Sequence, residues 1–141
     1  MNQAVKQFFD HYEQANATSD VTSIAKLYAD TFMFAGVNGA QAVKKEDFLK
    51  VIPKMKAHFV SIGLTKTELH SVQASTINAK YFLANTEWRM TVVDSKGCAR
   101  QVKALATYVL EQKANGTLAI VFQIDHQDLA TVVNDQRTTT S

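Results

Sequence analysis

The sequence predicts an α+β protein in which a curved antiparallel sheet is wrapped around three N-terminal helices. Three observations predict this class. Apolar residues recur mainly at helical spacing before Leu64, and from Leu64 onward they follow the period of strands. The joins between the later strands are short and rich in Asn, Gly and other turn residues, which is typical of hairpins. Helices followed by a run of strands are characteristic of the α+β class.

Length and composition indicate one globular domain. The chain has 141 residues, of which 46% are hydrophobic and 20% are charged, and these values are ordinary for a soluble protein. It shows no linker and no internal repeat, so we assign residues 1–133 to a single domain and residues 134–141 to a flexible polar tail. The single cysteine, Cys98, excludes an internal disulfide framework and a zinc site built on thiolates.

The charge pattern predicts neither a nucleic acid nor a membrane as a partner. The 15 basic and 13 acidic side chains are scattered, whereas nucleic-acid binders carry a positive stripe with interleaved aromatics. No apolar run approaches the roughly 20 residues that span a bilayer, and the N-terminus lacks the pattern of a secretory signal. We therefore expect a cytoplasmic protein. The histidines have no ligand-like spacing and there is no glycine-rich phosphate loop, so we expect no metal and no cofactor.

Two helices are predicted at the N-terminus. The first covers about residues 2–17, and the second is capped by Ser19 or Asp20 and stops near Asp30. Each helix presents one apolar face. These faces are formed by Val5, Phe8, Phe9, Tyr12 and Ala15 in the first helix and by Val21, Ile24, Leu27 and Tyr28 in the second.

A short strand and a third helix follow. Residues 31–37 are apolar and aromatic, and Asn38-Gly39 behind them is a turn signal. Residues 45–61 have helical spacing, but Pro53 lies inside this segment. Because proline lacks a backbone N–H and crowds the carbonyl four residues earlier, we expect a kink or a split helix there.

The rest of the chain predicts a sequential antiparallel meander. Four strands are expected, and short turn-forming joins connect them. A long twisted sheet of this kind curls around the helices and leaves an open mouth, where ligand pockets form. The strands are predicted at Thr65–Thr76, Tyr81–Asp94, Ala99–Gln112 and Leu118–His126.

The last strand carries two adjacent titratable residues, Asp125 and His126. Neighbouring residues of a strand point to opposite faces. Simple alternation places His126 on the same face as Phe122 and Ile124, and we expect this face to line the pocket. Asp125 is then expected to point away from it.

Four segments of the sequence resemble the nuclear transport factor 2-like superfamily, which includes ketosteroid isomerases, SnoaL-like polyketide cyclases and scytalone dehydratase. They cover the first-helix aromatic, the second helix, the strand that follows it and the close of the last strand. The match extends over about residues 3–130, and it implies a cone-shaped, cystatin-like fold and a homodimer packed through the sheet. The segments are His11-Tyr12-Glu13, residues 20–30 (DVTSIAKLYAD), residues 36–39 and residues 124–129.

The resemblance also allows a comparison with the catalytic residues of ketosteroid isomerases. These enzymes use a tyrosine of the first helix, an aspartate base on the first strand and a protonated aspartic acid on a late strand. Tyr12 matches the tyrosine, but the base position falls on Gly36 and the second acid falls near Ala106. Two of the three groups are missing, so isomerase activity by that mechanism is not expected.

We predict an apolar pocket for a small organic molecule, with cofactor-free acid–base chemistry (isomerisation, dehydration or cyclisation) if the protein is an enzyme. His126 is the candidate general base and Tyr12 the candidate hydrogen-bond donor. Each also has a structural alternative: a rim histidine that bonds to the backbone, and an amphipathic core tyrosine. The residues expected to line the pocket are Tyr28, Phe34, Met55, Phe59 and Trp88. Core packing is the alternative for the last four, and a dimer interface is a further alternative for Trp88.

A second hypothesis is a non-catalytic association module. In the strand over residues 99–112, Leu105 and Val109 lie on the face opposite the main apolar set. Apolar character on both faces suggests that helices cover one face and that a second subunit covers the other.

Overall fold

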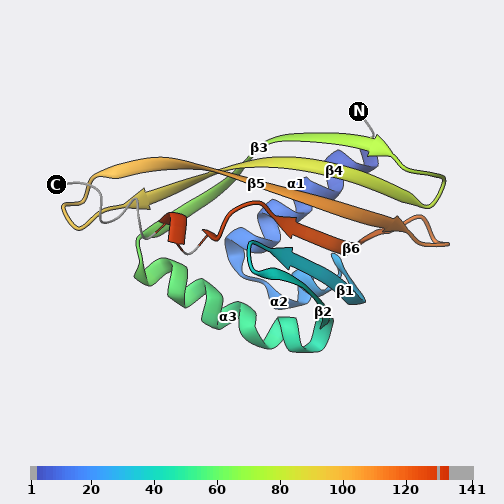
Figure 1. The fold of residues 1–141 in the computed structure, drawn as a ribbon, viewed down its shortest axis with the longest axis horizontal. Coiled ribbons are helices and arrows are strands. Elements are labelled where there is room, and N and C mark those ends of the chain that lie inside the picture. The colour runs from blue at the N-terminus through green and yellow to red at the C-terminus, as the bar shows by residue number, and fades with distance from the viewer. Residues whose placement is uncertain (1–2, 130, 134–141) are drawn as a thin grey trace.

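One six-stranded sheet carries the fold, and its strand order is β2-β1-β6-β5-β4-β3. The computed structural model describes residues 3–129 and 131–133, so the tail predicted over residues 134–141 lies outside the described residues. The long strands form an arched layer, and the helices lie on its concave side (Figure 1). The α+β prediction is confirmed. The elements are α1 (Gln3–Thr18), α2 (Val21–Ala25), β1 (Tyr28–Gly36), β2 (Gly39–Lys44), α3 (Lys45–Ser61), β3 (Leu64–Thr76), β4 (Tyr81–Val93), β5 (Ala99–Gln112) and β6 (Leu118–Asp125).

The predicted bounds are correct for α1 but too long for α2. α1 matches its predicted span, and Val5 and Phe9 on its apolar face are fully buried. α2 begins where expected, because the Asp20 side chain accepts hydrogen bonds from two backbone N–H groups of its first turn. It ends at Ala25, however, and not near Asp30. The chain leaves the helix because Leu27 and Tyr28 pair with Ile120 of β6 instead.

β1 and β2 form a hairpin at one edge of the sheet, and β2 was not predicted from the sequence. Val37 and Asn38 make the turn, and Gly39, which begins β2 and pairs with Gly36, has a φ of 119°, a conformation that favours glycine. β1 also pairs with β6 in a parallel sense. The sheet is therefore mixed: the β1–β6 pair is parallel, and all the remaining pairs are antiparallel.

α3 is a single helix, so of the kink or split expected at Pro53 the split is wrong. Pro53 lies inside this helix and is exposed. Ile52 is the one buried residue of α3, which means that this helix covers the concave side loosely. None of the described helices is both long enough and apolar enough to span a membrane.

The meander β3-β4-β5-β6 agrees with the prediction, and one side of it forms the core. We call this side the inner face, because α1 packs against it through Phe9 and Tyr12. α1 is also tied to the edge of the sheet, since the backbone N–H of Leu69 in β3 donates to the Glu13 carboxylate. The side chains that β4 and β5 bury on the inner face are Phe82, Ala84, Thr86, Trp88, Met90, Val92, Val102, Ala104, Ala106, Tyr108 and Leu110.

A one-residue bulge in β6 determines which side chains reach the inner face near its end. Val109 of β5 pairs with Phe122 and Leu110 pairs with Ile120, so Val121 is an extra residue. Past the bulge the alternation is inverted. Gln123 and Asp125 therefore lie on the inner face.

Candidate functional site

Five polar side chains form a hydrogen-bonded chain across the inner face, which we call the tyrosine–aspartate chain. The Tyr108 hydroxyl of β5 donates to the Tyr12 hydroxyl of α1 at 3.2 Å, and Tyr12 bonds to the Tyr28 hydroxyl at 3.3 Å. Tyr28 donates to Gln123 Oε1 at 2.6 Å, and Gln123 Nε2 donates to Asp125 Oδ1 at 3.1 Å. The chain thus connects α1, β1, β5 and β6.

The tyrosine–aspartate chain has one direction. A tyrosine hydroxyl has one proton, and that of Tyr28 is given to Gln123. Tyr12 must therefore donate to Tyr28, which leaves its oxygen to accept from Tyr108. Every donated proton points toward Asp125, the final acceptor. Asp125 Oδ2 has no hydrogen-bond partner among the described residues.

Burial sets the electrostatics of these groups. It raises the pKa of Asp125, although the Gln123 hydrogen bond and the charge of His126 partly oppose this effect. Burial also raises the pKa of Tyr12, and it raises those of Tyr28 and Tyr108 well above the ordinary value. The tyrosines therefore stay protonated at neutral pH, and Asp125 is the group in the chain that can exchange a proton.

Aromatic rings surround the tyrosine–aspartate chain. The Tyr12 ring lies 5.5 Å from that of Trp88 and 5.7 Å from that of Tyr108, between ring centroids. The Trp88 indole N–H donates to the Thr86 hydroxyl at 2.8 Å, and Thr86 donates to the Ala106 carbonyl at 2.8 Å. Trp88 therefore has no free donor, and its ring is buried in the core.

His126 does not join this site, and its predicted orientation is wrong. Its Nε2 lies 2.8 Å from the hydroxyl of Thr107, which itself donates to Asn85 on the face of the sheet opposite the core. The alternation that predicted otherwise was counted through β6 without the extra residue at Val121. The bulge places Asp125 on the inner face and His126 on the outer one.

The predicted lining residues are only partly brought together. Tyr28 and Trp88 lie at the site and both contact Tyr12. Phe34 and Phe59 are half-buried against the core, and Met55 is 45% exposed on α3.

Sequence reasoning missed Tyr108, Gln123 and Asp125 as site residues. Tyr108 could have been found, because it alternates with the buried residues of β5. Gln123 and Asp125 could not, because nothing in the residue types of β6 marks the bulge.

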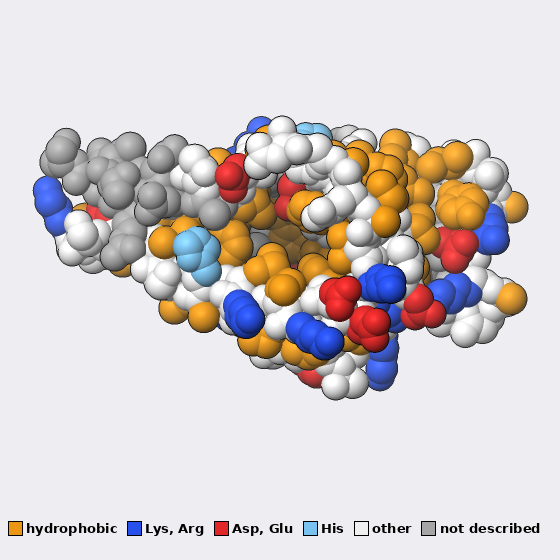
Figure 2. Space-filling model, turned by 60° about the horizontal axis from the view of Figure 1, so that its bottom comes forward, with side chains coloured by type: hydrophobic (Ala, Val, Ile, Leu, Met, Phe, Trp, Pro, Cys, Tyr) orange, Lys and Arg blue, Asp and Glu red, His pale blue; other side chains and the backbone are white. Residues whose placement is uncertain are grey.

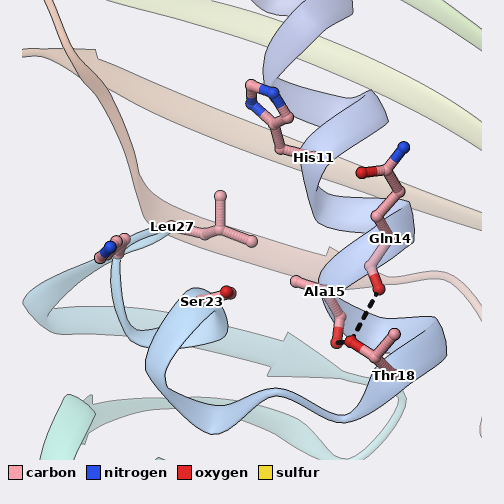
Figure 3. A pocket seen from close by; sticks show the side chains of 7 residues that line it. His11, Gln14, Ala15, Thr18, Ser23 and Leu27 are labelled. Carbon is pink, nitrogen blue, oxygen red and sulfur yellow. Dashed lines mark hydrogen bonds between the residues drawn. The ribbon is translucent and has the colours of Figure 1, made fainter.

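The surface is hollowed at two places that the views show. A hollow with hydrophobic walls, with acidic side chains at its edge, opens on the side of the molecule that carries α3 (Figure 2). A second hollow of about 390 Å³ lies between α1 and the α2 segment, where Leu27 and Ala15 face each other and Gln14 turns away (Figure 3). None of the residues predicted to line the pocket belongs to the second hollow. Its lining consists of His11, Gln14, Ala15, Thr18, Ser23, Lys26 and Leu27.

Among the residues that the structure describes, no group of three His, Cys, Asp or Glu side chains is placed to hold a metal ion.

An arched sheet with helices on its concave side is the architecture of the nuclear transport factor 2-like (NTF2-like) class. The chain belongs to the family described as NTF2-like protein (DUF6841), whose model matches residues 2–127. No curated protein matches the chain.

Several solved structures share the fold. An NTF2-like protein with a cystatin-like fold from Novosphingobium aromaticivorans is 11% identical, with a TM-score of 0.72 over 93% of this chain and 86% of that one. A ketosteroid isomerase-like protein from Erwinia carotovora atroseptica is 13% identical, with a TM-score of 0.66 over 89% and 95%. A protein from Xanthomonas campestris, provisionally described as a calcium/calmodulin dependent protein kinase II association domain, is 20% identical, with a TM-score of 0.65 over 87% and 84%. Identities this low show the fold alone.

The register of the sheet bears on the comparison with ketosteroid isomerases. Gly36 ends β1 and Ala106 is buried in the core, so neither position carries an acid. Asp125 lies directly opposite Ala106 in the β5–β6 pairing. A carboxyl is thus present beside the expected position, on the neighbouring strand.

Proposed function

We propose that the inner face binds a small organic molecule and that Asp125 exchanges a proton with it, without a cofactor. The observation that carries the proposal is the one-directional tyrosine–aspartate chain, which ends on a carboxyl with one unused oxygen. Asp125 and Tyr12 are half-buried rather than sealed, which supports the proposal because part of each residue is exposed to solvent. Sites of this kind combine apolar walls with a few convergent polar groups.

Burial suits Asp125 to acid–base work. A raised pKa makes its carboxylate a stronger base at neutral pH than an exposed aspartate. In an isomerisation, Oδ2 would take a proton from one atom of the ligand and return it to another. In a dehydration, the returned proton would leave with the departing hydroxyl as water. Tyr12 donates inside the protein, so it would contribute its ring and position its neighbours.

A ligand screen with two matched variants tests this proposal. We expect aromatic, terpenoid or polyketide-like compounds to raise the melting temperature of the wild-type protein, because they bind the folded state alone. Asp125→Asn keeps the shape of the side chain and is expected to reduce the shift, whereas His126→Gln on the outer face is expected to retain it. An absence of stabilising compounds, or a loss of the shift only in His126→Gln, would contradict the proposal.

The association module remains a second candidate, and the outer face of the sheet favours it. Leu105 and Val109 of β5 are only half-buried there, and Ile124 of β6 is 36% exposed. We propose a homodimer packed through this face. We also propose a cytoplasmic location, because an exposed free thiol such as that of Cys98 suits a reducing compartment.

A further inference from the structure

The inner face has hydrogen-bond acceptors to offer a ligand but few donors. The hydroxyl protons of Tyr12, Tyr28 and Tyr108 are all donated inside the tyrosine–aspartate chain. The indole of Trp88 and the hydroxyl of Thr86 are likewise committed to partners within the protein. The strongest unused group is the second carboxyl oxygen of Asp125. A ligand that bonds to this oxygen must bring its own proton.

The charge of Asp125 has no counter-ion on the inner face. The groups that face it are the hydroxyls of Tyr12 on α1, Tyr28 on β1 and Tyr108 on β5, together with the amide of Gln123 on β6. The nearest cationic group is its neighbour His126, which points to the outer face.

Several basic side chains of the sheet and of α3 pair with other groups. Arg89 and Lys103 pair with Glu87 on the outer face, and Lys45 pairs with Asp30. No described lysine or arginine lies within ion-pair distance of Asp125. A positively charged ligand would supply the missing partner.

The half-buried ring of Tyr12 also favours a cation. Tyr12 lies near the Asp125 carboxyl, and the buried rings of Tyr28, Trp88 and Tyr108 pack behind it in the core. The face of an aromatic ring carries partial negative charge and attracts an ammonium group, most strongly for tryptophan and where water is excluded. A partly exposed tyrosine ring and a carboxylate together select for a cationic nitrogen on a hydrocarbon body.

We infer that the ligand is a small organic amine, bound as its ammonium ion, with an N–H donating to Asp125 Oδ2 and its hydrocarbon part against the ring of Tyr12. The inference rests on the proposed function, since it names the class of molecule that this site takes. A neutral alcohol meets the need for a donor but leaves the charge unpaired. A carboxylate would be repelled by Asp125.

Three probes of one shape test the inference by calorimetry: 2-phenylethylamine, 2-phenylethanol and phenylacetate. The amine is expected to bind about 10- to 100-fold more tightly than the alcohol, the range for a hydrogen bond between charged groups, and phenylacetate is expected not to bind. Asp125→Asn should remove the preference for the amine while keeping the site folded. Glu46→Gln, which removes an exposed carboxylate on α3, should leave the preference unchanged.

The outcomes separate the inference from the proposed function. Equal or tighter binding of the alcohol or of phenylacetate would overturn the amine inference and leave the binding site standing. A preference for the amine that survives in Asp125→Asn would also overturn it. If none of the three probes binds, the amine inference fails, and if the ligand screen is empty as well, the proposed function fails with it. The amine should also bind more weakly as the pH falls through the pKa of Asp125, because the protonated carboxyl has no charge to pair.

Discussion

Asp125 shows how a single side chain can serve a site at a cost to the fold. It receives one hydrogen bond, from Gln123, and burial disfavours its charged form. A carboxylate in this position is tolerated by the rest of the core and does not stabilise it. Such groups are more often found at functional sites than in ordinary cores.

The pH dependence of stability follows from the raised pKa of Asp125. Because the folded-state pKa lies above the unfolded one, the stability this group contributes is fully present below the ordinary value of about 3.9 and is lost as the pH rises through the raised pKa. Asp125→Asn should therefore raise the melting temperature at pH 7, and the gain should disappear at acid pH. Thermal unfolding across this pH range measures it.

Glu46→Gln is the matched control for that experiment, since it removes a carboxylate that is exposed. Its effect on stability should stay within about 0.5 kcal/mol at any pH. A lower melting temperature for Asp125→Asn at pH 7 would mean that the charge of Asp125 is stabilised in the fold, contrary to its burial.

Among the elements, α3 combines a long apolar stripe with little buried surface. Ile52 is its one buried residue, whereas Met55 is 45% exposed one turn further on. Ile52→Ala should destabilise the protein by about 2–4 kcal/mol, because it removes buried methyl groups and leaves a cavity. Met55→Ala should change the free energy of unfolding by less than about 0.5 kcal/mol. Urea denaturation of both variants checks this, and similar losses would show that α3 packs differently.

The sequence predicts elements well where one periodic signal dominates. α1 and the strands β3, β4 and β5 lie within one residue of their expected bounds, because long runs alternate cleanly between core and surface. β2 was missed because nearly all of its residues are exposed and show no alternation. α2 was predicted too long because Leu27 and Tyr28 fit a helix face but pair with β6.

The candidate site was predicted less well, for a related reason. Tyr12, Tyr28 and Trp88 were placed together by the periodicity of three separate elements, and the structure brings their rings into contact. The acid–base residue was chosen by counting alternate positions along β6. That count is sensitive to one inserted residue, and a bulge is set by the pairing of the sheet on both sides rather than by the local sequence.

For the whole molecule, we predict that a second copy of the chain covers the outer face of the sheet. The predicted homodimer would bury Leu105 and Val109, which lie on the face away from the core. We expect sedimentation at micromolar concentration to give a dimer. Leu105→Glu should shift it to a monomer, since an unpaired charge in the centre of an interface is strongly unfavourable. Lys113→Glu, at an exposed hairpin, should leave it a dimer, and a monomeric wild-type protein would contradict the prediction.

The extra residue at Val121 has a consequence for how this architecture acquires new chemistry. If β6 paired regularly through Val121, without the bulge, His126 would turn to the inner face and Asp125 to the outer one, although neither residue would be mutated. In a strand that ends with two different ionisable groups, the gain or loss of a bulge is thus equivalent to a double substitution. Changes in strand pairing would then diversify catalysts built on such a scaffold.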